Sequence, residues 1–295
     1  MLYDKSNAEI LSEYNERVYG HEEAKKALIC LVARSRMRYF GSVSSMEPSK
    51  ILLIGGSGTG KTFLVDQLSK MLDFPLLCID ATQMSPGTGR NGITKQTCQL
   101  LCKDTVREWV ECHYNETEES GRNQLVVFVD EVDKLACSFE SSGNWNKHIQ
   151  NSFLSMFDDY SEGTSFIFSG AFSGLQTKVV KHSLGFNSLE KEEETLLDEA
   201  IVKYGLIPEF VGRLTSIVKL DEFGDREYRH LLNHVLLPKK QESLACFNGA
   251  SLNLSSDDID AMVKKALNSG QGVRYLKRQL DMLALEEEFG YEKTI

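Results

Sequence analysis

Five short runs of apolar residues alternate with helical stretches over about the first 220 residues of the chain. The runs at 51–54, 125–130 and 165–169 are almost wholly apolar, which is typical of central strands in a parallel sheet covered on both faces. Because parallel strands need crossover connections, this alternation predicts βαβ units and an α/β fold, a three-layer αβα domain with a five-stranded parallel sheet. The expected strands are 51–54, 75–79, 125–130, 165–169 and 215–220, and the expected helices are 22–40, 62–72, 93–111, 146–157 and 192–204.

The strand pattern stops near residue 222. Helical periodicity then fills 225–247 and 256–267, and a glycine-flanked helical stretch follows at 271–288. The sequence therefore predicts a large αβα domain over 1–222 and a small, mainly helical domain over 223–295. The small domain looks shortened, because its end at LALEEEFGYEKTI carries no evident final strand.

The run GGSGTGKT at 55–62 joins the first expected strand to the helix that follows it. It fits the pattern GxxxxGK[ST], in which glycines let successive backbone N–H groups turn toward a phosphate at a helix N-terminus. Lys61 is expected to reach the β- and γ-phosphates, and Thr62 to bind Mg²⁺. The predicted phosphate-binding residues are Gly55, Gly56, Ser57, Gly58, Thr59, Gly60, Lys61 and Thr62.

The run LVVFVDEVDK places two carboxylates at the end of the third expected strand. If this strand neighbours the first, Asp130 lies beside the glycine loop and holds Mg²⁺ together with Thr62. Glu131 then orients and polarises the attacking water. These residues predict an ATPase that uses ATP and Mg²⁺, with Asp133 and Lys134 forming a local surface pair.

Composition excludes several other classes of protein. A net charge of −10 and the lack of a basic stretch interleaved with aromatic residues argue against a nucleic-acid partner. No apolar stretch approaches the roughly 20 residues of a membrane span, and the charges scattered through the first twenty residues predict no signal peptide. The seven cysteines form no CxxC pair, so we expect a reduced, cytoplasmic setting without a membrane partner.

Six motifs in order resemble the AAA+ ATPases of the ClpX/HslU group, and ClpX most closely, from near residue 7 to near residue 282. The most specific of them is GLIPEFVGRL at 205–214. The others are VYGHEEAKKAL (18–28), LLIGGSGTGKT (52–62), VVFVDEVDKL (126–135), FIFSGAF (166–172) and GVRYLKR (272–278).

This resemblance implies roles for further residues. Val18 and Tyr19 correspond to residues around adenine, although spacing alone would make them a hydrophobic staple before a helix. Ser169 is near the sensor-1 position, where a polar side chain meets the γ-phosphate; an ordinary strand-end serine is the alternative. Arg213 matches the arginine finger; the alternative is a surface arginine that caps a helix. Arg274 matches sensor 2; the alternative is an ordinary cationic residue at the start of a basic helix.

A finger that acts on a neighbouring subunit implies a ring, and the resemblance implies a homo-hexamer with ATP at its subunit interfaces. ClpX proteins carry a zinc-binding N-terminal domain, and we expect none in this sequence because it contains no CxxC pair. Leu184, Gly185 and Phe186 match a tripeptide that docks on a ClpP-like peptidase, or they anchor a loop to its own domain.

The glycine-rich segment Ser85–Gly92 stands where the group carries its pore loop, but it has no aromatic residue and offers Thr88 and Arg90 instead. Two functions stay open. One is an ATP-dependent unfoldase of ClpX type that acts on protein substrates, is not itself a peptidase and delivers them to a ClpP-like peptidase. The other is an ATP-dependent switch or assembly factor that threads no substrate.

Overall fold

The structure is a computed structural model that divides into two compact units, each described here by itself. The large unit comprises Met1–Ile54 and Thr62–Leu220, and the small unit comprises Gly55–Lys61 and Asp221–Ile295. The described residues are 5–39, 47–74, 76–84, 125–137, 145–159, 164–175, 189–245 and 251–292.

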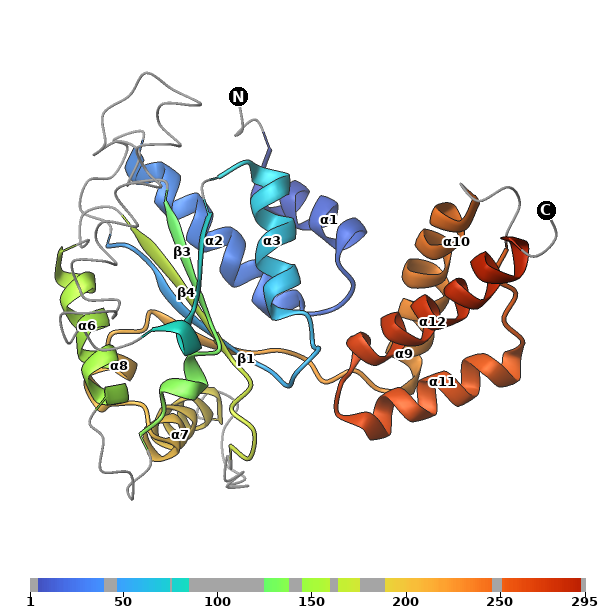
Figure 1. Cartoon of the computed structure of the whole chain (residues 1–295). Helices are drawn as coiled ribbons and strands as arrows, with labels where there is room; N and C mark the ends of the chain where they lie inside the picture. Colours follow the sequence, from blue (N-terminus) through green and yellow to red (C-terminus); the bar gives the residue numbers. More distant parts are fainter. Residues whose placement is uncertain are drawn as a thin grey trace. The chain divides into compact units, whose positions relative to one another are not determined.

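The large unit is built on a five-stranded, wholly parallel sheet, as predicted (Figure 1). Its strand order is β2-β3-β4-β1-β5. Each strand begins and ends within two residues of its expected range, because short apolar runs mark buried strands locally. The strands are β1 (Lys50–Ile54), β2 (Leu76–Asp80), β3 (Val126–Asp130), β4 (Ser165–Gly170) and β5 (Ser216–Lys219).

Strand β4 lies between β1 and β3, so the first and third strands are not neighbours. Phe168 of β4 pairs with Leu52 on one side and with Val129 on the other. From the sequence, Asp130 is expected beside the glycine loop on the condition that β3 neighbours β1. This condition is not met. The carboxyl ends of β1, β3 and β4 still meet at one edge of the sheet, since all the strands run the same way.

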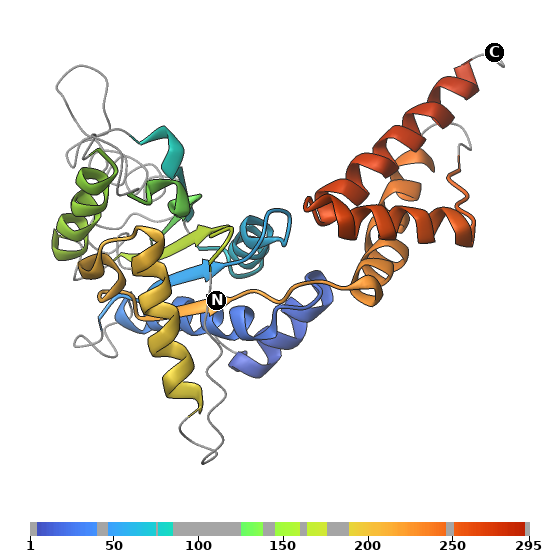
Figure 2. The same ribbon diagram turned by 90° about the horizontal axis from the view of Figure 1, so that it is seen from below.

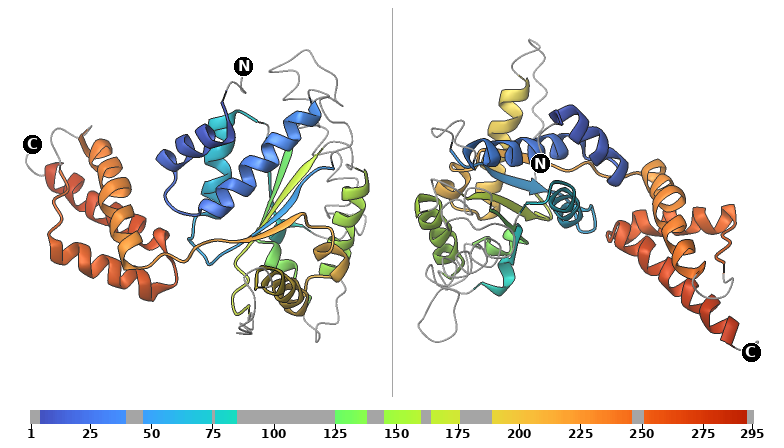
Figure 3. Two further views of the ribbon diagram at one scale, coloured as in Figure 1. Left: turned by 180° about the vertical axis from the view of Figure 1, so that it is seen from behind. Right: turned by 90° about the horizontal axis from the view of Figure 1, so that it is seen from above.

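Helices cover both faces of the sheet (Figure 3). Alternate strand residues point to opposite faces. On one face Leu53 and Phe128 join a core with α1, α2 and α3; on the other, Phe166 and Phe168 join a core with α6, α7 and α8. The helices are α1 (Asn7–Arg17), α2 (Glu22–Tyr39), α3 (Lys61–Leu72), α6 (Trp145–Asp159), α7 (Leu189–Tyr204) and α8 (Pro208–Val211). The expected helix at 93–111 falls outside the described residues.

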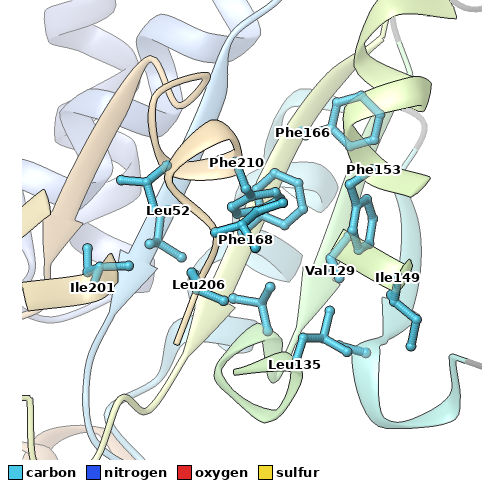
Figure 4. Close-up of a cluster of buried hydrophobic side chains, with 14 of the residues drawn as sticks. Leu52, Val129, Leu135, Ile149, Phe153, Phe166, Phe168, Ile201, Leu206 and Phe210 are labelled. Carbon is cyan, nitrogen blue, oxygen red and sulfur yellow. The ribbon is translucent and has the colours of Figure 1, made fainter. Parts of the chain in front are cut away.

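A cluster of phenylalanines fixes the short helix α8 to the sheet (Figure 4). The ring of Phe210 lies edge-on to that of Phe168, with centroids 4.9 Å apart. Phe153 of α6 contacts the same two rings at 5.5 and 6.1 Å. Such edge-to-face pairs add directional preference to apolar burial. Because α8 has only one turn of its own, this cluster holds the chain just before Arg213.

The small unit contains helices and no strand in its described part, apart from the glycine loop and short connecting segments (Figure 2). Helix α9 (Asp225–Leu231) continues through a π-helical turn (Leu232–Leu236) into α10 (Leu237–Ala245), and α11 (Ser256–Ser269) and α12 (Val273–Glu292) follow. Ser255 caps α11 through the N–H of Asp258. Leu232, Leu244, Val263 and Leu276 are among the residues of a separate core, so this unit has apolar contacts of its own.

Gln150 of α6 is a fully buried polar residue within the large unit. Its Nε2 donates to the carbonyl oxygen of Leu135 at 2.7 Å and to that of Gly205 at 3.3 Å. Its Oε1 accepts from the backbone N–H of Ile207 at 2.7 Å. One amide thereby joins the chain after β3 to the chain that begins α8.

We predict that Gln150→Leu lowers the free energy of unfolding by about 2–4 kcal/mol, because buried backbone groups of Leu135 and Ile207 lose their partner. Denaturant unfolding measures this change. Asn151→Leu is the matched control, since Asn151 is exposed on the same helix and should change stability by no more than about 0.5 kcal/mol. Equal losses in both variants would contradict the assignment.

Candidate functional site

The glycine loop leaves the end of β1 and ends where α3 begins, in the strand–loop–helix order that the sequence predicted. Gly58 and Gly60 have φ values of 77° and 99°, a region that favours glycine. Lys61 Nζ donates to the carbonyl oxygens of Gly55 and Gly56 at 2.6 and 3.0 Å. Thr59 Oγ1 donates to the Gly56 oxygen at 2.9 Å. These bonds give the loop a defined conformation at a helix N-terminus, which suits an anion.

The Asp130 carboxylate lies at the carboxyl edge of the sheet and accepts three hydrogen bonds. Thr62 Oγ1, from the first turn of α3, donates to Oδ2 at 2.7 Å. Ser169 Oγ, from β4, and the backbone N–H of Glu131, at 2.9 Å, donate to Oδ1. The inserted strand β4 thus supplies the side chain that lies between the other two elements. Thr62 and Ser169, which come from different sequence motifs, thus meet at the carboxylate of Asp130.

The chemistry of these oxygen donors fits Mg²⁺. Magnesium prefers hard oxygen ligands, and it is usually held by one or two carboxylates while substrate phosphates and water complete its shell. The hydroxyl of Thr62 and the carboxylate of Asp130 are adjacent, so one ion can reach both. Within the residues that the structure describes, no group of three His, Cys, Asp or Glu side chains offers a denser protein cage.

Glu131 adopts a left-handed backbone conformation, with φ 58° and ψ 33°. This region is uncommon for a residue with a side chain, and such strain concentrates at functional sites. The turn separates the exposed Glu131 from the oriented Asp130 and leads into the buried residues Val132 and Asp133. An exposed carboxylate directly after Asp130, where Mg²⁺ is expected, is available to act on water.

Asp133 corrects one sequence-based expectation. It does lie near Lys134, with 3.6 Å between Oδ2 and Nζ, but it is buried, with 4% of its surface exposed, and so is not part of a surface pair. Its Oδ1 accepts the backbone N–H of Ala171 at 3.1 Å. A Cβ at Gly170 would come within 2.8 Å of that oxygen. Asp133 therefore fixes the chain just after Ser169.

The remaining predicted residues lie on different elements. Val18 is buried at the end of α1, and Tyr19 is partly exposed next to it. Arg213 is exposed just after α8, and its Nη1 donates to the Leu154 carbonyl oxygen at 3.4 Å. Arg274 is exposed in the first turn of α12, and within the small unit its Nη1 lies 3.3 Å from Ser57 Oγ. Their roles stay predictions.

Two predicted segments fall outside the described residues. They are Ser85–Gly92, the expected pore loop, and Leu184–Phe186, the expected peptidase tripeptide. A membrane-spanning helix is not found in the described part of the chain, where no helix is both long and apolar enough.

A glycine loop between β1 and α3, an acidic end of β3 and a strand inserted between them define a P-loop ATPase. A family model for the AAA domain (Cdc48 subfamily) matches residues 47–217, which is more than half of the chain. The chain therefore belongs to this AAA family, and it is a nucleotide-binding ATPase. It is also similar to ClpX, the ATP-binding subunit of the ATP-dependent Clp protease, from Porphyromonas gingivalis. The two are 23% identical, over 97% of this chain and 78% of that protein.

We predict that Glu131→Gln lowers kcat for ATP hydrolysis by about 100-fold or more, because the amide cannot accept the proton of the attacking water. ATP affinity should stay within about threefold, since the glycine loop and Asp130 are unchanged. Steady-state ATPase assays and equilibrium ATP binding measure the two quantities. Glu199→Gln, an exposed change on α7, is the control. Near-normal turnover of Glu131→Gln would refute the assignment.

Proposed function

We propose that the chain is an ATP-dependent protein-remodelling ATPase of ClpX type, which hydrolyses Mg-ATP to unfold protein substrates. The observation that carries the hydrolytic part is the Asp130 carboxylate, held by Thr62, Ser169 and the Glu131 N–H. The similarity to ClpX extends over 97% of the chain, so it includes the small unit, and this supports the remodelling part.

The side chains of the site divide the work. Bound Mg²⁺ neutralises charge on the phosphates and would be held by Thr62 and Asp130. Lys61 binds the β- and γ-phosphates, and Glu131 orients the attacking water. Ser169 acts as sensor 1 and contacts the γ-phosphate. Its hydroxyl also donates to Asp130, so it connects the phosphate to the proposed Mg²⁺ ligand. Val18 and Tyr19 bind adenine, and Arg274 of α12 acts as sensor 2.

Arg213 is proposed to act on ATP bound to the next subunit of a homo-hexamer. Its guanidinium is exposed, and the phenylalanine cluster and Gln150 fix α8 just before it. A guanidinium at such a place can neutralise the γ-phosphate in the transition state.

We predict that Arg213→Ala lowers kcat on the order of 1000-fold, as expected for loss of an arginine finger. Mixing it with the Glu131→Gln chain, which is also strongly impaired, should restore ATPase activity. In a mixed ring, the intact Glu131 of one subunit meets the intact Arg213 of its neighbour. Arg226→Ala, an exposed change on α9, is the control for lost charge. No recovery on mixing would argue against action between subunits.

Unfolding itself is tested with a tagged, stably folded fluorescent protein. ATP-dependent loss of its fluorescence, absent with Glu131→Gln, supports the proposal. Degradation on adding a ClpP-like peptidase, abolished by Phe186→Ala, would support docking through Leu184, Gly185 and Phe186. ATPase activity without unfolding of any substrate would contradict the unfoldase assignment.

A switch or assembly factor is the second candidate, favoured by the lack of an aromatic residue in Ser85–Gly92. A stacking ring lets a pore loop grip many different sequences, whereas Arg90 suits an acidic or carbonyl partner better. In this second function, ATP binding orders a ring that binds one partner and does not thread a polypeptide through its pore.

We predict that Gly89→Tyr raises the rate of unfolding of a generic substrate by about twofold to fivefold, because one added aromatic contact strengthens the grip. Unfolding rate per ATP hydrolysed is the measurement, with Gly89→Ser as the control. If Gly89→Tyr changes nothing while Arg90→Ala abolishes binding of a partner, the switch is the better description.

A further inference from the structure

Lys25 is a fully buried lysine in the first turn of α2, with 1% of its surface exposed. Its Nζ donates to Asn15 Oδ1 at 2.7 Å and to the backbone oxygen of Val18. The same nitrogen lies 5.5 Å from the centroid of the Tyr14 ring. All three partners belong to α1 or to the residue that ends it. The amine therefore binds the chain where α1 leads into Val18 and Tyr19.

Core stability alone does not account for this amine. Burial lowers the pKa of Lys25 to about 8, against the opposing effect of Glu22, because the charged form is costly away from water. An apolar side chain of similar length would fill the same space without that cost. The amine instead supplies a directional hydrogen bond to the carbonyl of Val18. This bond orients the backbone that leads into Tyr19.

A second contact extends this arrangement to the phosphate-binding helix. Tyr14 is fully buried, and its hydroxyl donates to the carbonyl oxygen of Leu64 at 2.6 Å. Leu64 lies in the first turn of α3, which begins with Lys61 and Thr62. The ring that faces Lys25 is thus hydrogen-bonded to the start of α3. The Val18–Tyr19 stretch and the start of α3 are held by one buried set of contacts.

We propose that Lys25 is a positioning residue that sets the Val18–Tyr19 backbone and thereby selects adenine over other bases. The inference rests on the proposed function, in which Val18 and Tyr19 bind adenine. Lys25 itself touches no nucleotide in this scheme. Its loss disturbs recognition of the base and leaves recognition of the phosphates intact.

The test compares Lys25→Met with Lys26→Met. Lys26 is the next residue on the same helix, and its side chain is half exposed and pairs with Glu23 on the surface. Titration calorimetry measures the Kd of ADP, of GDP and of inorganic tripolyphosphate, each with Mg²⁺. Lys25→Met should weaken ADP binding about tenfold and reduce the preference for ADP over GDP, with tripolyphosphate within about twofold. Lys26→Met should match the unmodified chain.

Asn15→Ala supplies a second variant in case Lys25→Met does not fold. Asn15 is exposed, and its loss removes one of the two oxygens that orient the amine. It should reduce the ADP preference in the same direction by about twofold to threefold. Thermal unfolding of each variant, without nucleotide, identifies any general loss of stability.

The outcomes separate the two claims. Unchanged ADP affinity and base preference in a folded Lys25→Met chain would overturn the inference. So would an equal loss for ADP, GDP and tripolyphosphate, which indicates a general structural defect. An unmodified chain that binds neither ADP nor tripolyphosphate would refute the proposed function itself.

Discussion

The rest of the structure depends on how the Asp130 carboxylate is held. Three donors reach it from three elements: Thr62 from α3, Ser169 from β4 and the Glu131 N–H from the strained turn after β3. They can meet only because β4 lies between β1 and β3 in a sheet whose strands all run the same way. Charge-assisted bonds of this kind fix both oxygens of the carboxylate, so an ion that binds there meets prearranged ligands.

The limit of sequence reasoning follows from the same arrangement. Strand bounds, the glycine loop and the acidic strand end could be predicted, because each depends on a run of residues adjacent in the sequence. The place of β4 could not, since strand order depends on pairings between distant parts of the chain. Asp133 shows this on a smaller scale. Its position after Glu131 suggests a surface charge, whereas its partner, the N–H of Ala171, is 38 residues away. Only the fold brings the two together.

A similar dependence joins the hydrolytic site to the segment that carries Arg213. Gln150 bonds Leu135, shortly after Glu131, and Ile207, at the start of α8. The N–H of Cys137 also donates to the Gly205 oxygen at 2.9 Å. Hydrogen bonds thus join the backbone after the acidic strand end to the backbone before Arg213. A shift of either must break buried hydrogen bonds, which makes independent movement costly.

Gln150 and Lys25 lie in the helical layers on opposite faces of the sheet, and their chemistry differs as their tasks do. An amide both donates and accepts, so Gln150 can bond a carbonyl and an N–H at once and join two segments. An ammonium only donates, so Lys25 can bond acceptors alone, and it binds the Val18 carbonyl and Asn15 Oδ1. A lysine at position 150 would bury a charge and leave the N–H of Ile207 without its acceptor, whereas a glutamine at position 25 would face two acceptors with an amide oxygen that also needs a donor. In each layer, the residue type therefore matches the backbone groups that have to be held.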